Sequence, residues 1–209
     1  MKLFITSDWH INHKNITGPS VSSWDRGYRD FSSTEEMNNV IIDNCNSIVS
    51  AEDFIIYGGD LLFGPDKLVN LEKLMNSLVC RNWIYIYGNH DEWMYKKQEN
   101  KFAVQGILRC PMHHEYTFSY KGKNILIRHY SPEEWDVLNG ELPAYESKNR
   151  HKNLNYVRDP DTIFLYGHEH HSDPSRKLDI GVDTDHNGHK KFMPYLLDDA
   201  IDIYLGESR

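Results

Sequence analysis

The sequence predicts an α/β fold in which a two-layer β core is flanked by helices. Three observations support this fold class. Strand-like apolar runs alternate with helical patterns up to about residue 100, and the pattern after residue 107 changes to β-rich hairpins. No repeat of fixed period, low-complexity tract or linker interrupts the 209 residues. We therefore expect a single domain over residues 1–209.

The first half of the chain predicts strands and helices in turn. Ser33 and Glu36 form the pattern of a capping box that opens a helix, and an apolar stripe from Met37 to Val49 follows at near-helical spacing. A second helix opens at Asp66, with leucines spaced along one face. The expected strands cover 2–7, 53–57 and 82–87, and a short third helix runs from 92 to about 100.

The second half predicts mainly strands. Residues 116–120 and 124–129 alternate around Lys121-Gly122-Lys123, which is typical of a hairpin. Residues 162–166 form another apolar strand, and 178–182 are expected to form one more. The pattern over 196–205 fits either a short strand or a helix.

Composition excludes several classes of protein. The net charge of −8 argues against a protein that holds long nucleic acid by a basic surface. No apolar run is long enough to span a membrane, and the N-terminus lacks the pattern of a signal peptide. Three widely spaced cysteines give no zinc or redox motif, so a reducing cytoplasm is the expected location. Histidine is abundant, at 12 residues.

Five of the strand-like runs end in side chains that can bind metal. In three of them a Tyr-Gly dipeptide marks the junction, where glycine permits a sharp turn and a close backbone approach. Ligands in α/β folds bind beyond the carboxyl ends of the strands, so one sheet edge would receive all five endings. The side chains delivered there are Asp8, His10, Asp60, Asn89, His129, His168 and His170.

This set of side chains has the chemistry of a transition-metal site. Imidazole and carboxylate ligands without thiolate suit manganese, iron, zinc, nickel or cobalt, and disfavour magnesium and calcium. Seven ligands are too many for one tetrahedral zinc but enough for two ions that share a carboxylate. Such a pair of ions would attract a phosphate and a hydroxide. Each motif alone could be a turn or a core histidine; their order along the chain favours the metal site.

The ordered motifs resemble those of the calcineurin-like metallophosphoesterases. The motifs are Asp-x-His, Gly-Asp, Gly-Asn-His-Asp, a lone His and Gly-His-x-His. Residues 7–16 and 31–37 further resemble a branch of small bacterial and phage phosphoesterases, and the likeness extends from residue 2 to about 183. The resemblance implies a four-layer α/β/β/α sandwich in which two packed mixed sheets are flanked by helices.

The resemblance also implies a role for each site residue. Asp60 would bridge two divalent transition-metal ions, for which we favour manganese, with iron, nickel, zinc or cobalt as alternatives. The first ion would be held by Asp8, His10 and His170, and the second by Asn89, His129 and His168. His90 would protonate the leaving group, with Asp91 orienting it. The implied mechanism is in-line attack by a metal-bridging hydroxide.

The expected function is phosphoester hydrolysis. We favour a phosphodiesterase that acts on a small or nucleotide-like substrate, because His90 is present and the chain is acidic. The alternative is a phosphomonoesterase of the nucleotidase kind. A nuclease and a non-catalytic metal-binding scaffold are disfavoured, the latter because no ligand of the set is missing. The sequence does not indicate the oligomeric state.

Two features stay open at this stage. His13 could support the site or be purely structural. The segment from Trp24 to Arg29 combines aromatic residues with arginines, so it could line a nucleotide-like substrate or be a packed surface loop.

Overall fold

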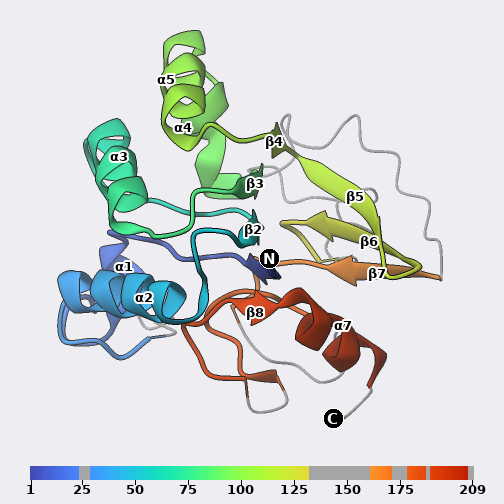
Figure 1. The fold of residues 1–209 in the computed structure, drawn as a ribbon. Helices are drawn as coiled ribbons and strands as arrows, with labels where there is room; N and C mark the ends of the chain where they lie inside the picture. Colours follow the sequence, from blue (N-terminus) through green and yellow to red (C-terminus); the bar gives the residue numbers. More distant parts are fainter. Residues whose placement is uncertain (24–28, 132–160, 171–177, 187–188, 207–209) are drawn as a thin grey trace, which may run out of the picture.

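A five-stranded sheet forms the centre of the protein in the computed structural model, which describes residues 1–23, 29–131, 161–170, 178–186 and 189–206 (Figure 1). Its strand order is β4-β3-β2-β1-β8. Strands β1 to β4 are parallel, whereas β8 pairs antiparallel with β1. The strands are β1 (Leu3–Thr6), β2 (Phe54–Tyr57), β3 (Trp83–Ile86), β4 (Met112–His113) and β8 (Tyr195–Leu196).

A second, three-stranded sheet lies beside the first, with the order β5-β6-β7 (Figure 1). Its strands are β5 (Glu115–Tyr120), β6 (Lys123–Arg128) and β7 (Thr162–Leu165). Strands β5 and β6 form the predicted hairpin, and β7 is parallel to β6. The prediction of two mixed sheets flanked by helices is confirmed.

Helices cover the face of the large sheet that points away from the small sheet (Figure 1). They are α1 (Lys14–Thr17), α2 (Thr34–Ile48), α3 (Lys67–Ser77), the 3-10 turn η1 (Asn89–Asp91), α4 (Glu92–Tyr95) and α5 (Gln98–Leu108). The last helix, α7 (Leu197–Leu205), lies beside the small sheet instead.

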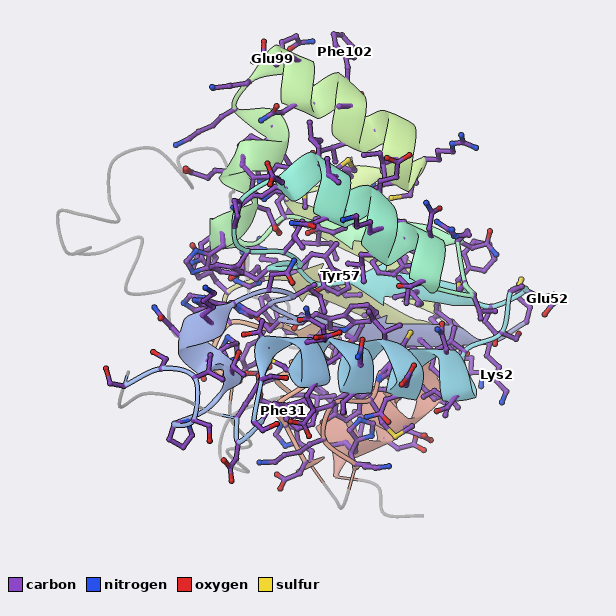
Figure 2. All side chains as sticks on the ribbon, turned by 90° about the vertical axis from the view of Figure 1, so that its left-hand side faces the viewer. Lys2, Phe31, Glu52, Tyr57, Glu99 and Phe102 are labelled. Atoms are coloured by element: carbon purple, nitrogen blue, oxygen red, sulfur yellow. The ribbon has the colours of Figure 1, made fainter. Side chains whose placement is uncertain are left out.

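Successive side chains of each central strand point to opposite faces of the large sheet, which divides the core into two layers. Phe4 and Ile55 face the helices and pack with residues of α2 and α3, whereas Ile5 and Ile56 face the small sheet and pack against Ile125. Figure 2 shows Tyr57 at the centre of the side chains between the helices and the large sheet. Both faces of the large sheet are therefore buried, as its nearly continuous apolar strands predict.

Local sequence signals explain the start of α2. Ser33 is the N-cap, and its side chain accepts a hydrogen bond of 3.0 Å from the backbone N–H of Glu36. The Glu36 carboxylate accepts hydrogen bonds from Ser32 rather than from Ser33, so the predicted capping box forms in a shifted version.

Two predicted elements differ from the structure, and a third is decided between its two alternatives. The single helix expected from residue 92 is two helices, α4 and α5, because Lys97 has an extended backbone between them. The strand expected over 178–182 is reduced to two isolated bridges, Ser7 with Gly181 and Tyr166 with Asp179. Residues 196–205 resolve into the end of β8 and helix α7.

None of the helices in the described ranges is long and apolar enough to cross a membrane. All three cysteines are free thiols, and Cys45 and Cys80 are buried.

Candidate metal centre

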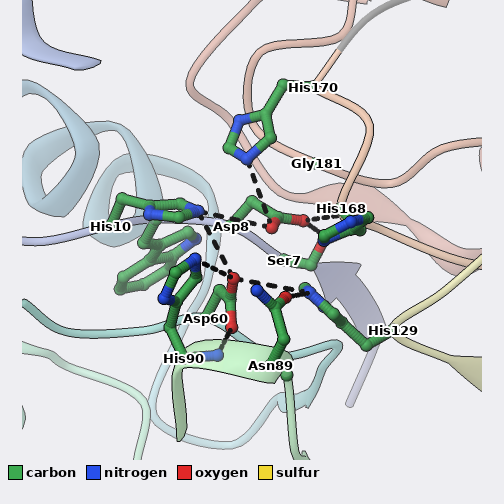
Figure 3. A network of polar contacts seen from close by, with 12 residues as sticks. Ser7, Asp8, His10, Asp60, Asn89, His90, His129, His168, His170 and Gly181 are labelled. Atoms are coloured by element: carbon green, nitrogen blue, oxygen red, sulfur yellow. Dashed lines mark hydrogen bonds and ion pairs between the residues drawn. The ribbon is translucent and has the colours of Figure 1, made fainter. Parts of the chain in front are cut away.

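The predicted ligands lie together where five strands end. Asp8 and His10 follow β1, Asp60 follows β2, and Asn89 stands in η1 directly after β3. From the small sheet, His129 follows β6, and His168 and His170 follow β7. Figure 3 shows these side chains pointing toward one another, with Asp60 between the two sides of the cluster.

The ligand atoms form two adjacent groups. Asp8, His10 and His170 bring one potential ligand atom each within 4.8 Å of one another. Asp60, His129 and His168 form a second group by the same measure. Asn89 joins the second group, because its side-chain oxygen lies 2.8 Å from Nε2 of His129.

Asp60 links the two groups through a single oxygen. Its Oδ1 accepts a hydrogen bond of 2.8 Å from the backbone N–H of His90. Its Oδ2 lies 3.7 Å from Nε2 of His10 in the first group and 3.4 Å from Nε2 of His129 in the second. Oδ2 is therefore the atom that both groups share (Figure 3).

The predicted ligand residues adopt an unusual backbone conformation. Five of them have positive φ angles, between 51° and 77°: Asp8, His10, Asp60, His168 and His170. The left-handed region is unfavourable for residues other than glycine, at a cost on the order of 1 kcal/mol each. Contacts with the neighbouring structure must offset this cost. The left-handed backbone turns each side chain sharply from its strand end into the cluster.

Two glycines allow the strand ends to approach one another. A Cβ on Gly88 would lie 2.1 Å from Oδ1 of Asp60, and one on Gly167 would lie 2.3 Å from Oδ2 of Asp8. Neither position has room for a side chain without displacing a carboxylate of the site. The Tyr-Gly junctions noted in the sequence are thus places of close packing.

The imidazole rings are anchored on the side that faces away from the cluster. Nδ1 of His129 lies 2.9 Å from the carbonyl oxygen of Gly58, so it carries the proton and leaves Nε2 directed at Asp60. Nδ1 of His10 lies 3.0 Å from Nδ1 of His13, whose ring stacks on Phe63 at 3.8 Å. His13 therefore packs against His10, one of the predicted ligands.

Burial and charge set the protonation of the histidines. Burial and the neighbouring His129 lower the pKa of His168 to about 4, and burial and His170 hold the pKa of His10 well below its usual value. Both rings are therefore neutral at pH 7, the form that binds metal. His129 behaves differently. Burial alone would lower its pKa, but the charges of Asp60 and Asp8 outweigh burial and raise it to about 10.

The carboxylates stay ionised in spite of complete burial. Burial opposes ionisation of Asp60, but the charge of His129 and a hydrogen bond with it outweigh burial and hold the pKa of Asp60 below its usual value. The pKa of Asp8 is lowered as well: His129, His170 and the hydroxyl of Ser7 together overcome the effect of burial. The site is thus a buried cluster of two ionised carboxylates and several imidazoles, of which His10 and His168 are neutral at pH 7.

His90 and Asp91 occupy different environments. The His90 side chain is 47% exposed, and its Nε2 lies 3.9 Å from Oδ2 of Asp60. The Asp91 carboxylate is buried and accepts hydrogen bonds of 2.8 Å from the backbone N–H groups of Gly88 and Asp60. None of the contacts found in the described ranges joins it to the His90 ring, so Asp91 holds the loop that carries His90 rather than the ring itself.

Sequence reasoning missed two supporting residues, Arg29 and Asp183. The sequence leaves Arg29 either in a substrate rim or in a packed surface loop; in the structure its side chain is buried and bound to Asp183, so Arg29 does not line an exposed rim. Residues 24–28 of that segment lie outside the described ranges. Asp183 belongs to no motif, and a pairing across 154 positions leaves no local signal.

Comparison with known proteins places the chain in a family. The model of the calcineurin-like phosphoesterases matches residues 1–172. A curated but uncharacterised protein of Methanocaldococcus jannaschii is 34% identical over 92 residues, and the match covers 44% of this chain and 48% of that relative. The chain thus spans about half the length of this relative.

One of the solved structures compared has the same fold. A protein of unknown function from Aquifex aeolicus superposes with a TM-score of 0.57 at 16% identity, covering 97% of this chain and 98% of that one. Yfce, a phosphoesterase from E. coli, gives a TM-score of 0.40 at 18% identity over 82% of this chain and 71% of that chain. Since the family model covers most of the sequence, the chain belongs to the calcineurin-like phosphoesterase family.

Proposed function

We propose that this protein is a dinuclear metal-dependent phosphoesterase. The position of Asp60 carries the proposal. Its Oδ2 lies within 3.7 Å of a ligand nitrogen from each of the two groups, His10 in one and His129 in the other. A carboxylate oxygen between two sets of ligands is what a shared bridging ligand requires.

Each group of side chains fits one divalent ion. Asp8, His10 and His170 would hold the first, whereas Asn89, His129 and His168 would hold the second, with Asp60 between them. In the part of the chain that the structure describes, Oδ1 of Asp8 and Nε2 of His10 are buried and make no hydrogen bond. Such atoms are costly to bury unless a ligand satisfies them. Nitrogen and carboxylate ligands suit manganese, which we favour, as well as iron, nickel, zinc or cobalt.

In the proposed reaction, the metal ions and the side chains of the protein make different chemical contributions. When bound, two ions would supply a hydroxide at neutral pH and neutralise charge on the phosphoryl oxygens. His90 is half exposed at the edge of the cluster, so its ring can reach the leaving-group oxygen of a substrate and donate a proton to it. Asp91 supports this step indirectly, because it binds the backbone N–H of Gly88, just before His90, and that of Asp60 in the loop after β2.

We favour a small or nucleotide-like phosphodiester as substrate, with a phosphomonoester as the alternative. A proton donor matters most when the leaving group is a poorly stabilised alkoxide, as in a diester of an alcohol. The net charge of −8 disfavours long nucleic acid, since binding it depends on neutralising many phosphates. The three free thiols favour a reducing compartment such as the cytoplasm.

The proposal is tested with metal-free protein and Mn²⁺. Addition of Mn²⁺ should restore hydrolysis of bis(p-nitrophenyl) phosphate, and p-nitrophenyl phosphate tests the monoester alternative. Asp60→Asn should abolish turnover and lower the bound metal from two ions to one or none. Asp43→Asn, the same substitution on an exposed residue of α2, is the control and should change neither.

His90→Ala separates proton transfer from metal binding. It should retain two ions, because His90 is not among the grouped ligands, and it should slow esters of alkyl alcohols more than nitrophenyl esters. Protein that binds no Mn²⁺ and hydrolyses neither ester would refute the proposed function.

A further inference from the structure

A buried ion pair lies directly behind the first group of ligands. Nε of Arg29 lies 2.8 Å from Oδ1 of Asp183, and Nη2 lies 3.0 Å from Oδ2, so the guanidinium and the carboxylate meet through two parallel hydrogen bonds. The two side chains are 0% and 2% exposed. An ion pair that is so well shielded from water is retained only where its geometry is good, because desolvation of both charges is costly.

The carboxylate of Asp183 also determines how His170 is protonated. Its Oδ2 lies 2.7 Å from Nδ1 of His170. The carboxylate is paired with the Arg29 guanidinium through two hydrogen bonds, so toward His170 it accepts a hydrogen bond rather than donating one. Nδ1 therefore carries the proton, and Nε2, which lies 3.5 Å from Oδ1 of Asp8, is the nitrogen directed into the cluster.

Arg29 extends the same support to the turn after β1. Its Nη1 donates to the carbonyl oxygen of Trp9 at 2.8 Å, and its Nη2 donates to the carbonyl oxygen of Asp8 at 2.7 Å. This is the turn in which Asp8 and His10 both have positive φ angles. One guanidinium thus contacts the backbone that carries two ligands and, through Asp183, the ring of the third.

We propose that Arg29 and Asp183 form a positioning pair that aligns Asp8, His10 and His170 for the first metal ion. The inference rests on the proposed dinuclear site and goes beyond it, because it assigns to residues outside the ligand set a specific effect on one of the two ions. Hydrogen bonds of this kind orient a ligand imidazole and raise its basicity, and their loss lowers metal affinity about 10–100-fold. No contact of Arg29 or Asp183 in the described ranges reaches the second group, so the second ion should be unaffected.

The test compares Mn²⁺ binding by calorimetry in metal-free wild type, Asp183→Asn and Arg29→Lys. Asp183→Asn keeps the shape of the side chain and removes its charge, whereas Arg29→Lys keeps the charge and removes the paired geometry. Parallel titrations in a His168→Ala background, which lacks a ligand of the second ion, identify the step that belongs to the first ion. Asp198→Asn breaks an ion pair with Lys121 between α7 and the β5–β6 hairpin and is the matched control.

Asp183→Asn and Arg29→Lys should each lower the Mn²⁺ affinity for the first ion at least tenfold and change that for the second ion by less than threefold. Asp198→Asn should change neither affinity. A purely structural pair would lower the stability of metal-free protein and weaken both steps together, which would overturn the inference. If wild type binds two ions and folded Asp183→Asn binds both as tightly, the inference is overturned and the proposed function stays intact. Wild type that binds no Mn²⁺ would overturn both.

A measurement on wild type covers the case in which the variants do not fold. In Zn²⁺-loaded protein, nitrogen-15 spectra of the histidine rings should show His170 with a protonated Nδ1 and a zinc-bound Nε2. Binding of zinc through Nδ1 would contradict the role of Asp183.

Discussion

Replacement of Asp91 by alanine tests whether this carboxylate holds the site loops. Asp91 is fully buried, and its Oδ2 accepts two backbone hydrogen bonds of 2.8 Å, from Gly88 and from Asp60. Alanine leaves both N–H groups without this acceptor in a place that water does not reach. Each buried donor that loses its partner costs about 1–3 kcal/mol, so the two together cost roughly 2–6 kcal/mol.

The buried negative charge of Asp91 destabilises the fold, whereas its hydrogen bonds stabilise it. The cost of Asp91→Ala therefore depends on pH. Burial and the neighbouring Asp60 raise the pKa of Asp91 from 3.8 to about 6. The folded state therefore binds the proton more tightly than the unfolded state, and the stability that this contributes is present below pH 4 and lost as the pH rises through 6. The alanine variant has no such group, so its deficit relative to wild type should be larger at pH 5 than at pH 8.

The assay is urea unfolding of metal-free protein in the presence of a chelator, followed by far-ultraviolet circular dichroism at both pH values. We expect Asp91→Ala to lower the free energy of unfolding by about 3 kcal/mol at pH 5 and by less at pH 8. Asp43→Ala removes an exposed carboxylate from α2 and should change it by no more than about 0.5 kcal/mol. A loss below about 1 kcal/mol at both pH values, or a larger loss at pH 8, would refute the reasoning.

Three further outcomes follow from the structure. Gly167→Ala places a Cβ 2.3 Å from Oδ2 of Asp8, so the protein should keep its circular dichroism spectrum but bind less Mn²⁺ by metal analysis; unchanged metal content would contradict the close approach. Ser33→Ala removes the cap of α2 and should cost about 1 kcal/mol in urea unfolding, and no measurable cost would mean that water replaces the cap. Burial raises the pKa of Cys45 and Cys110 to about 12, so at pH 8 a disulfide reagent should modify them at least 100-fold more slowly in folded than in unfolded protein, and equal rates would contradict this.

The sequence predicted the central strands and the ligand cluster because both depend on local patterns. Runs such as residues 54–57 are apolar, short and followed at once by glycine and a polar side chain, and parallel strands bring such endings to one edge. The family's motif order then supplied roles that spacing alone left open. The individual roles of the site residues and the single-domain organisation stay predictions.

The features that the sequence did not predict depend on tertiary structure. The break between α4 and α5 occurs at Lys97, where no proline or glycine marks it in the sequence. The segment from 178 to 182 has the composition of a strand, yet only two isolated bridges form. The pairing of Arg29 with Asp183 exists only because two distant loops meet behind His170, and one sequence contains no record of that contact.

The left-handed backbone at five ligands has a consequence for how the protein would evolve. Glycine adopts such angles without a steric penalty, so glycine at His10, His168 or His170 should relieve on the order of 1 kcal/mol of strain in metal-free protein. Glycine would also remove a buried ring and its contacts, which for His170 include the hydrogen bond to Asp183, so relief of strain alone does not make such a variant more stable. Selection for heat resistance alone is therefore expected to keep the rings of His10 and His170, or side chains that fill the same space, in spite of the backbone strain.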